Sequence, residues 1–131
     1  MAHPSTTFRF LAEPTDVNFG GNVHGGIVMK WIDQAAYACA AQWSKCYCVT
    51  VSANGIRFIK PIKVGQLVEI TASLVHTGAS SMHIYVVVKS GDATENTTSV
   101  ANRCFITFMA VHAKDFAKQL DSDFTENIGF N

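Results

Sequence analysis

The sequence predicts an α+β fold in which one long helix packs against a five-stranded antiparallel sheet. An apolar, Ala-rich segment without Pro runs from about Gly25 to Gln42 or Ser44, as expected of a helix. One strand-like segment precedes it and four follow, separated by short polar connections. The last three strands are joined by hairpins and are therefore antiparallel. A chain of 131 residues suffices for one such domain with a substantial core.

The first strand is predicted at residues 6–12, where the side chains alternate, and a loop rich in Pro, Asp, Asn and Gly follows it. The helix is apolar on almost every side, which is typical of a buried helix. Asp33 is the one acid within it. A buried carboxylate is costly unless it is paired, hydrogen-bonded or performs chemistry. Asp33 is therefore the first candidate functional residue.

The strand after the helix covers about residues 48–58 and contains the dipeptide Asn54-Gly55. This dipeptide favours a hairpin turn or a bulge. We expect a bulge in one long strand, because the residues on both sides keep strand character. Further strands are predicted at 67–77, 80–90 and 99–112. In the strand at 80–90, one face carries the inward set: Met82, Ile84, Val86 and Val88. The opposite face is also partly apolar, which suggests a partner there.

Composition excludes several classes of protein. Ten basic residues balance ten acidic ones without a basic stripe, which argues against a nucleic-acid partner. The first residues lack the apolar segment of a signal peptide, and Lys30 and Asp33 interrupt the helix well short of a membrane span. We therefore expect a cytoplasmic protein organised as a single domain over residues 1–131, with a C-terminal tail at 114–131 outside the strand pattern.

Neither the cysteines nor the histidines have metal-ligand spacing, so no metal or prosthetic group is expected. Cys46 and Cys48 are separated by one residue, which fits neither a C-x-x-C redox pair nor a zinc site. Cys39 and Cys104 lie within apolar segments. We expect the cysteines to be small, buried, reduced side chains.

Two motifs resemble those of the hotdog-fold acyl-CoA thioesterases, most of all the cytosolic acyl-CoA hydrolases. The first is GNVHGGIVMKWID, in which Asn22 precedes Gly25 and Gly26, and Asp33 stands seven residues after the second Gly. The second is F-x-x-P-x-x-x-G at residues 58–65, followed by a strand, a T-G-x-S-S hairpin and another strand. The resemblance extends over most of residues 7–112.

The resemblance implies hydrolysis of acyl-CoA to a free acid and CoA. The unpaired amides of a helix start carry partial positive charge, and Gly25 and Gly26 leave them unshielded as an oxyanion hole. Asp33 would act as general base or nucleophile, and burial would suit it to accept a proton near neutral pH. Asn22 would hold the attacking water or the carbonyl. The alternative role of Asn22 is to cap the helix.

The resemblance also implies a homodimer or a dimer-based tetramer or hexamer. Asn22 and Asp33 are about 15 Å apart if the segment rises as a helix does. The acid of one chain would therefore face the Asn-Gly-Gly segment of the other. No cofactor is implied beyond the coenzyme A of the substrate. The candidate substrate-binding residues are His24, Thr50, Arg57, Lys60, Gly78, Ser80 and Ser81.

Two other functions remain open. A hotdog dehydratase or hydratase would use His24 as a base with Asp33 as an acid. A non-catalytic module would bind acyl-CoA without hydrolysing it. The H-G-G context of His24 matches the thioesterases better, and a chain that keeps both Asn22 and Asp33 is more consistent with an enzyme.

Overall fold

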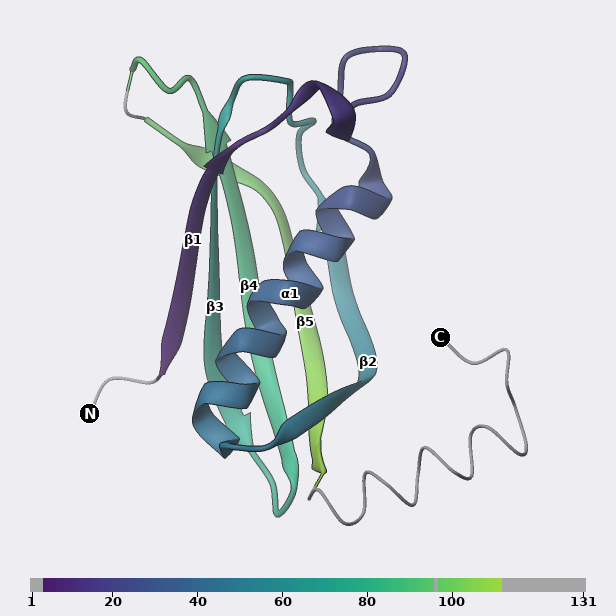
Figure 1. The fold of residues 1–131 in the computed structure, drawn as a ribbon, viewed down its shortest axis with the longest axis vertical. Coiled ribbons are helices and arrows are strands. Elements are labelled where there is room, and N and C mark those ends of the chain that lie inside the picture. The colour runs from purple at the N-terminus through teal and green to yellow at the C-terminus, as the bar shows by residue number, and fades with distance from the viewer. Residues whose placement is uncertain (1–3, 96, 112–131) are drawn as a thin grey trace.

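The computed structural model describes residues 4–95 and 97–111 and confirms the predicted α+β architecture (Figure 1). The helix α1 spans Gly25–Ser44. The strands are β1 (Ser5–Leu11), β2 (Tyr47–Phe58), β3 (Leu67–Thr77), β4 (Ser81–Gly91) and β5 (Ser99–Val111), and a short 3₁₀ helix spans Pro14–Asp16. The strands form one sheet in the order β1-β3-β4-β5-β2 with antiparallel neighbours. The predicted tail at 114–131 lies outside the described residues.

The predicted bulge in β2 is confirmed. The pairing of β2 with β5 shifts register between Thr50 and Ser52 and again between Asn54 and Arg57. Gly55 adopts a φ of 61°, a conformation that residues with a Cβ rarely take. The two halves of β2 therefore continue as one bent strand along β5 and do not fold back as a hairpin. Because β2 ends the strand order, it is an edge of the sheet.

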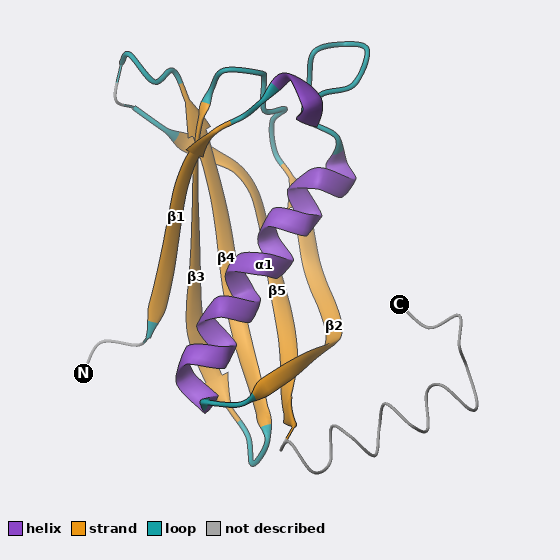
Figure 2. Cartoon of the chain, viewed as in Figure 1, coloured by secondary structure: helices purple, strands orange, loops and turns teal. Residues whose placement is uncertain are grey.

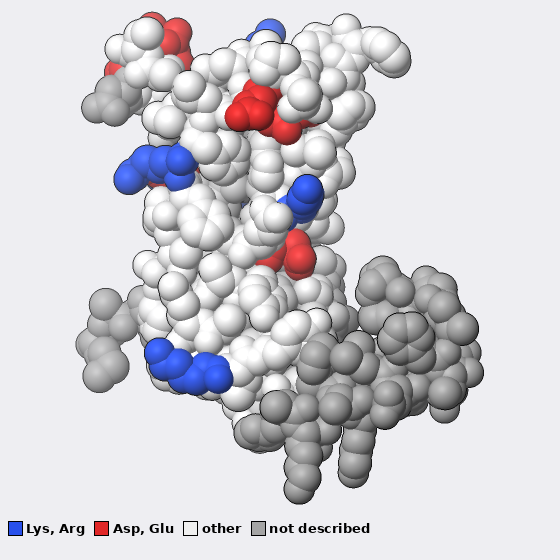
Figure 3. Space-filling model, viewed as in Figure 1, with Lys and Arg blue, Asp and Glu red and all other residues white. Residues whose placement is uncertain are grey.

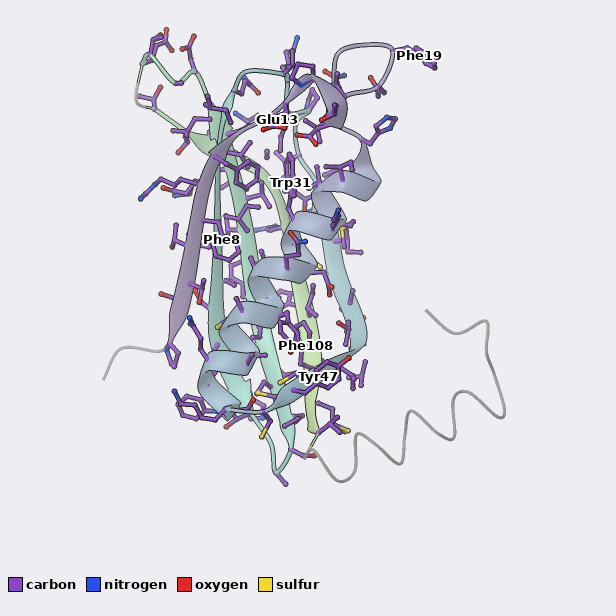
Figure 4. The ribbon with its side chains drawn as sticks, in the orientation of Figure 1. Phe8, Glu13, Phe19, Trp31, Tyr47 and Phe108 are labelled. Atoms are coloured by element: carbon purple, nitrogen blue, oxygen red, sulfur yellow. The ribbon has the colours of Figure 1, made fainter. Side chains whose placement is uncertain are left out.

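The core lies between the sheet and one stripe of α1. The buried helix residues are Val28, Ile32, Ala35, Ala36, Cys39 and Ala40. The predicted inward set of β4, from Met82 to Val88, is buried against them. Trp31 lies between α1 and β1, with its ring centre 4.8 Å from that of Phe10 (Figure 4). These contacts fix the helix across the sheet.

The prediction that α1 is buried on all sides is wrong for the single chain. Asp33 and Gln34 are exposed, because the sheet covers only one side of the helix (Figure 2). The apolar composition of α1 therefore exceeds what burial within one chain requires. Asp33 lies on the side that the sheet leaves open, where its carboxylate is accessible from outside the chain.

All four cysteines are unpaired, as predicted. Cys39, Cys48 and Cys104 are buried, and Cys46 is half-buried. Burial raises the pKa of the Cys39 thiol and of the Cys104 thiol above the ordinary value. Both thiols are therefore held in the protonated form, in which they are poor nucleophiles and behave as small core side chains.

Candidate active site

The start of α1 presents two amides without partners. His24 occupies the N-cap position, and its carbonyl accepts hydrogen bonds from the amides of Ile27 at 3.0 Å and Val28 at 3.1 Å. Within residues 4–95 and 97–111, no hydrogen bond uses the amide of Gly25 or Gly26. Amides at this position point away from the helix and carry partial positive charge. They are suited to bind an oxygen that gains negative charge.

Packing within the chain does not require glycine at either position. A Cβ on Gly25 would lie 3.7 Å from the ring of Phe58, which is ordinary contact, and a Cβ on Gly26 would meet nothing within 4 Å. Neither residue has a positive φ. The missing side chains therefore clear space in front of the free amides. This favours access by a molecule from outside the chain.

The alternative prediction that Asn22 caps the helix is wrong, since His24 takes that position without a side-chain bond. Asn22 instead forms an isolated β-bridge with Lys63. Its amide donates to Oδ1 of Asn18 at 3.2 Å, and the amide of Gly20 donates to the same oxygen at 2.9 Å. The loop from 18 to 22 is thus organised around the Asn18 side chain. Phe19, in the same loop, points away from the body of the molecule (Figure 4).

Asp33 has one hydrogen-bond partner in the described part of the chain. Its Oδ1 accepts from Oγ1 of Thr50 at 3.0 Å. The contact joins the middle of α1 to β2, so Thr50 lies beside the helix. Asp33 and Thr50, both candidates from the sequence, are therefore brought together. Thr50 was expected only to line the substrate site, whereas in the structure it contacts the acid. Asp33 and Asn22 share no hydrogen bond within the described residues.

The two basic candidates differ in availability. Arg57 is exposed near the end of β2, opposite Arg103 of β5. The Lys60 ammonium donates to the carbonyl of Ser90 at 3.1 Å and to the hydroxyl of Ser99. Lys60 is therefore engaged within the chain, which leaves its ammonium less available for the substrate binding that the sequence predicted. The sequence could not indicate this, because Ser90 and Ser99 are far from Lys60 in the chain.

The hairpin candidates lie at the other end of the molecule. The β3–β4 turn is beside the C-terminal end of α1, away from Gly25 and Gly26 (Figure 1). The Gly78 amide donates to the Ser81 carbonyl at 2.9 Å, and the Ser80 carbonyl accepts from Ala110. A single chain therefore does not bring Gly78, Ser80 and Ser81 to the helix start. The Gly78 amide is also not free to bind a substrate.

A cavity of about 320 Å³ opens beside the helix start. Gly25 and Val28 contribute from α1, Phe58 and Lys60 from the end of β2 and the connection after it, and Asn102 from β5. Asn102 was not among the functional residues predicted from the sequence. The sequence does place a polar Asn at an inward-facing position of β5, between Val100 and Cys104, and this could have indicated a buried amide.

Charge and metal chemistry add little to this picture. On the face drawn in Figure 3, basic and acidic side chains are few and scattered. In the described ranges, no three His, Cys, Asp or Glu side chains gather as a metal site would need. No described helix has the length and apolarity to cross a membrane.

Comparison with known proteins identifies the class. A model of the thioesterase superfamily matches residues 20–97. The chain is 33% identical over 102 residues to protein VdlD of Helicobacter pylori, which covers 78% of this chain and 59% of VdlD. It is 29% identical to the cytosolic acyl coenzyme A thioester hydrolase of Rattus norvegicus, over 86% of this chain and 30% of that protein. The chain thus spans less than two thirds of the length of either relative.

Solved structures agree with the sequence comparison. The acyl-CoA hydrolase of Staphylococcus aureus, solved with butyryl coenzyme A and coenzyme A, superposes with a TM-score of 0.82 at 27% identity, covering 86% of this chain and 69% of that one. The hexameric thioesterase of Yersinia pestis has a TM-score of 0.76 at 31% identity, covering 82% of this chain and 87% of that one. One helix on a five-stranded antiparallel sheet defines this class as the hotdog fold. The chain belongs to the thioesterase superfamily.

Proposed function

We propose that this chain hydrolyses acyl-CoA thioesters to the free acid and CoA. The observation that carries the proposal is the pair of free amides at Gly25 and Gly26, at glycines that internal packing does not require. Preorganised donors of this kind stabilise the oxyanion of acyl transfer, and loss of one donor lowers the rate about 10²–10³-fold. Membership of the thioesterase superfamily makes a thioester carbonyl the natural ligand.

In the proposed reaction, Asp33 removes a proton from a water molecule that attacks the thioester carbon. The developing oxyanion is held by the helix amides, the carbon–sulfur bond breaks, and the CoA sulfur leaves as a thiolate that takes up a proton. Attack by the carboxylate itself, through an anhydride that water then opens, is the alternative route for Asp33. The Thr50 hydroxyl, 3.0 Å from Oδ1, fixes the carboxylate in either case. Water and side chains suffice, so we propose no cofactor.

The proposed site is shared by two chains. Asp33 lies more than two helical turns from the helix start of its own chain, so its carboxylate serves the amides of a second copy. The edge strand β2 is suited to join the copies, because edge strands have unpaired backbone groups. Val51 is 52% exposed and Phe58 59% exposed along it. A second copy paired there would cover these side chains and the open side of α1, and would thereby bury Asp33.

We propose Asn18, more than Asn22, as the asparagine of the site. Structures of the Staphylococcus aureus hydrolase include single replacements by Ala of one Asn, one Asp and one Thr. That Asp stands fifteen residues after the Asn and seventeen before the Thr. Asp33 stands fifteen residues after Asn18, eleven after Asn22, and seventeen before Thr50. The Asn18 amide is held by two backbone donors to its Oδ1, which leaves Nδ2 to donate to a substrate.

We also propose further substrate contacts, an assembly of dimers and a location. Arg57, exposed near the end of β2, is available to a CoA phosphate, and His24 lies exposed at the helix start. In a dimer, the hairpin at Gly78–Ser81 of one copy is the part that can approach the helix start of the other. Larger assemblies of dimers are expected because a hexamer is found for the Yersinia pestis thioesterase. A cytoplasmic location is proposed by likeness to the cytosolic rat hydrolase.

A panel of acyl-CoAs with a thiol-trapping dye tests the proposed function. We expect release of free CoA from saturated acyl-CoAs, at a rate that depends on chain length. A dehydratase using His24 and Asp33 would instead change the absorbance of an enoyl- or hydroxyacyl-CoA without releasing thiol. Binding of acyl-CoA with neither change would leave the non-catalytic module as the function.

A further inference from the structure

Asn102 is a buried amide without a partner. The residue is 1% exposed, and neither Nδ2 nor Oδ1 has a hydrogen-bond partner within the described residues. The hydroxyl of Ser90 on the neighbouring strand is also buried and unpaired. Almost all buried polar groups in folded proteins are paired with protein, water or a ligand. An amide left with both donor and acceptor unused therefore indicates a site for another molecule.

The position of Asn102 connects it to the proposed active site. It lies on β5, opposite Phe58 of β2 and Val88 of β4. It lines the cavity of about 320 Å³ that Gly25 also lines. Because Gly25 supplies one of the two free amides, a thioester held there can direct its acyl group into the space bounded by Asn102.

The rest of the cavity wall suits an acyl chain. Most of the lining is apolar: Val23, Val28, Phe58, Ile59, Ile62 and Ala101. Lys60 also lines the space, but its ammonium already donates to Ser90 and Ser99. The Asn102 amide is thus the unengaged side-chain polar group on this wall. An all-carbon acyl group would remove water from the cavity and leave that amide unpaired.

We propose that the cavity receives the acyl group of the substrate and that Asn102 binds a hydroxyl on it, so that hydroxyacyl-CoAs are the preferred substrates. This inference depends on the proposed function. A hydroxyl can donate to Oδ1 and accept from Nδ2, which satisfies both halves of the amide. A keto oxygen would leave Oδ1 unpaired, and a carboxylate, which has no proton to donate, would place a negative oxygen against it.

The same cavity limits the size of the acyl group and determines how strongly the site selects an acyl group that carries a hydroxyl. The cavity holds roughly ten water-sized groups, so the acyl group is short. A site built around a buried hydrogen-bonding group rejects an analogue that lacks the matching group, because the protein group is then left unpaired. An apolar wall alone would discriminate only by chain length.

The test compares kcat/KM for matched substrates: butyryl- with 3-hydroxybutyryl- and 4-hydroxybutyryl-CoA, and hexanoyl- with 6-hydroxyhexanoyl-CoA. Acetoacetyl- and succinyl-CoA complete the panel. We expect at least one hydroxyacyl-CoA to exceed its plain counterpart about tenfold or more, as two neutral hydrogen bonds would give. Asn102→Leu, which keeps the size but removes the amide, should bring that ratio to one or below. Ile106→Leu, on the same face of β5, is the matched control and should leave the ratio unchanged.

The outcomes separate this inference from the proposed function. Hydrolysis without a preference for any hydroxyacyl-CoA would overturn the inference alone, and so would a preference that survives in Asn102→Leu. Asn102 would then hold structural water only. If Asn102→Leu does not fold, Asn102→Ala is used with the same criterion. If nothing is hydrolysed, the proposed function fails, and calorimetric affinities for the same substrate pairs decide whether Asn102 selects a hydroxyl.

Discussion

Replacing Asp33 with Asn lowers the rate of acyl-CoA hydrolysis about 10²–10⁴-fold, the usual contribution of a general base. Asn has nearly the same shape and can still bond to the Thr50 hydroxyl, but it can neither remove a proton from water nor attack the thioester. The side chain is exposed in the single chain, so the fold does not depend on its charge. We therefore expect kcat to fall while the unfolding temperature changes little.

The measurement is steady-state release of CoA, with the melting temperature recorded for each variant. Gln34→Ala, at the exposed neighbouring position, is the control and should hydrolyse at the rate of the unmodified chain. Thr50→Val should give a rate between those of the unmodified chain and Asp33→Asn, because it removes the hydrogen bond that orients the carboxylate and keeps the carboxylate itself. Turnover of Asp33→Asn close to normal would remove Asp33 from the reaction.

Replacing Asn18 with Ala lowers the rate about 10²-fold, whereas Asn22→Ala changes it only a few-fold. The Asn18 side chain accepts from two amides of its own loop, and its Nδ2 is left to donate to the substrate. Loss of such a preorganised donor is typically of this size. The same CoA-release assay measures both variants. Should Asn22→Ala be the slower one, the role returns to Asn22, as the sequence motif first indicated.

The fold could be predicted because its signals are local. The start of α1 at Gly25 follows from the Gly pair, and the bulge in β2 follows from Asn54-Gly55 within a segment of strand residues. The inward face of β4 follows from simple alternation. Each of these depends on residues adjacent in the sequence.

The site was only partly predictable because its contacts are not local. The composition of α1 correctly indicated an unusually apolar helix, but it could not separate burial by the sheet from burial by another chain, and Asp33 lies on the side that the sheet leaves open. The engagement of Lys60 by Ser90 and Ser99 depends on strand register. The separation of the Gly78 hairpin from the helix start depends on the lengths of β3 and α1. That the Asn102 amide has no hydrogen-bond partner could be seen only from the full packing of the core.

The shared site is tested most directly by mixing two inactive chains, Asp33→Ala and Asn18→Ala, by co-expression with different affinity tags. In a mixed dimer, one site carries both changes and the other carries neither. With random pairing, about one quarter of the unmodified activity should return, and it should follow the doubly tagged fraction. The same two proteins combined without exchange of chains are the control. If the mixed dimers remain as inactive as either parent, the carboxylate and the asparagine do not act across two chains and the proposed site is wrong.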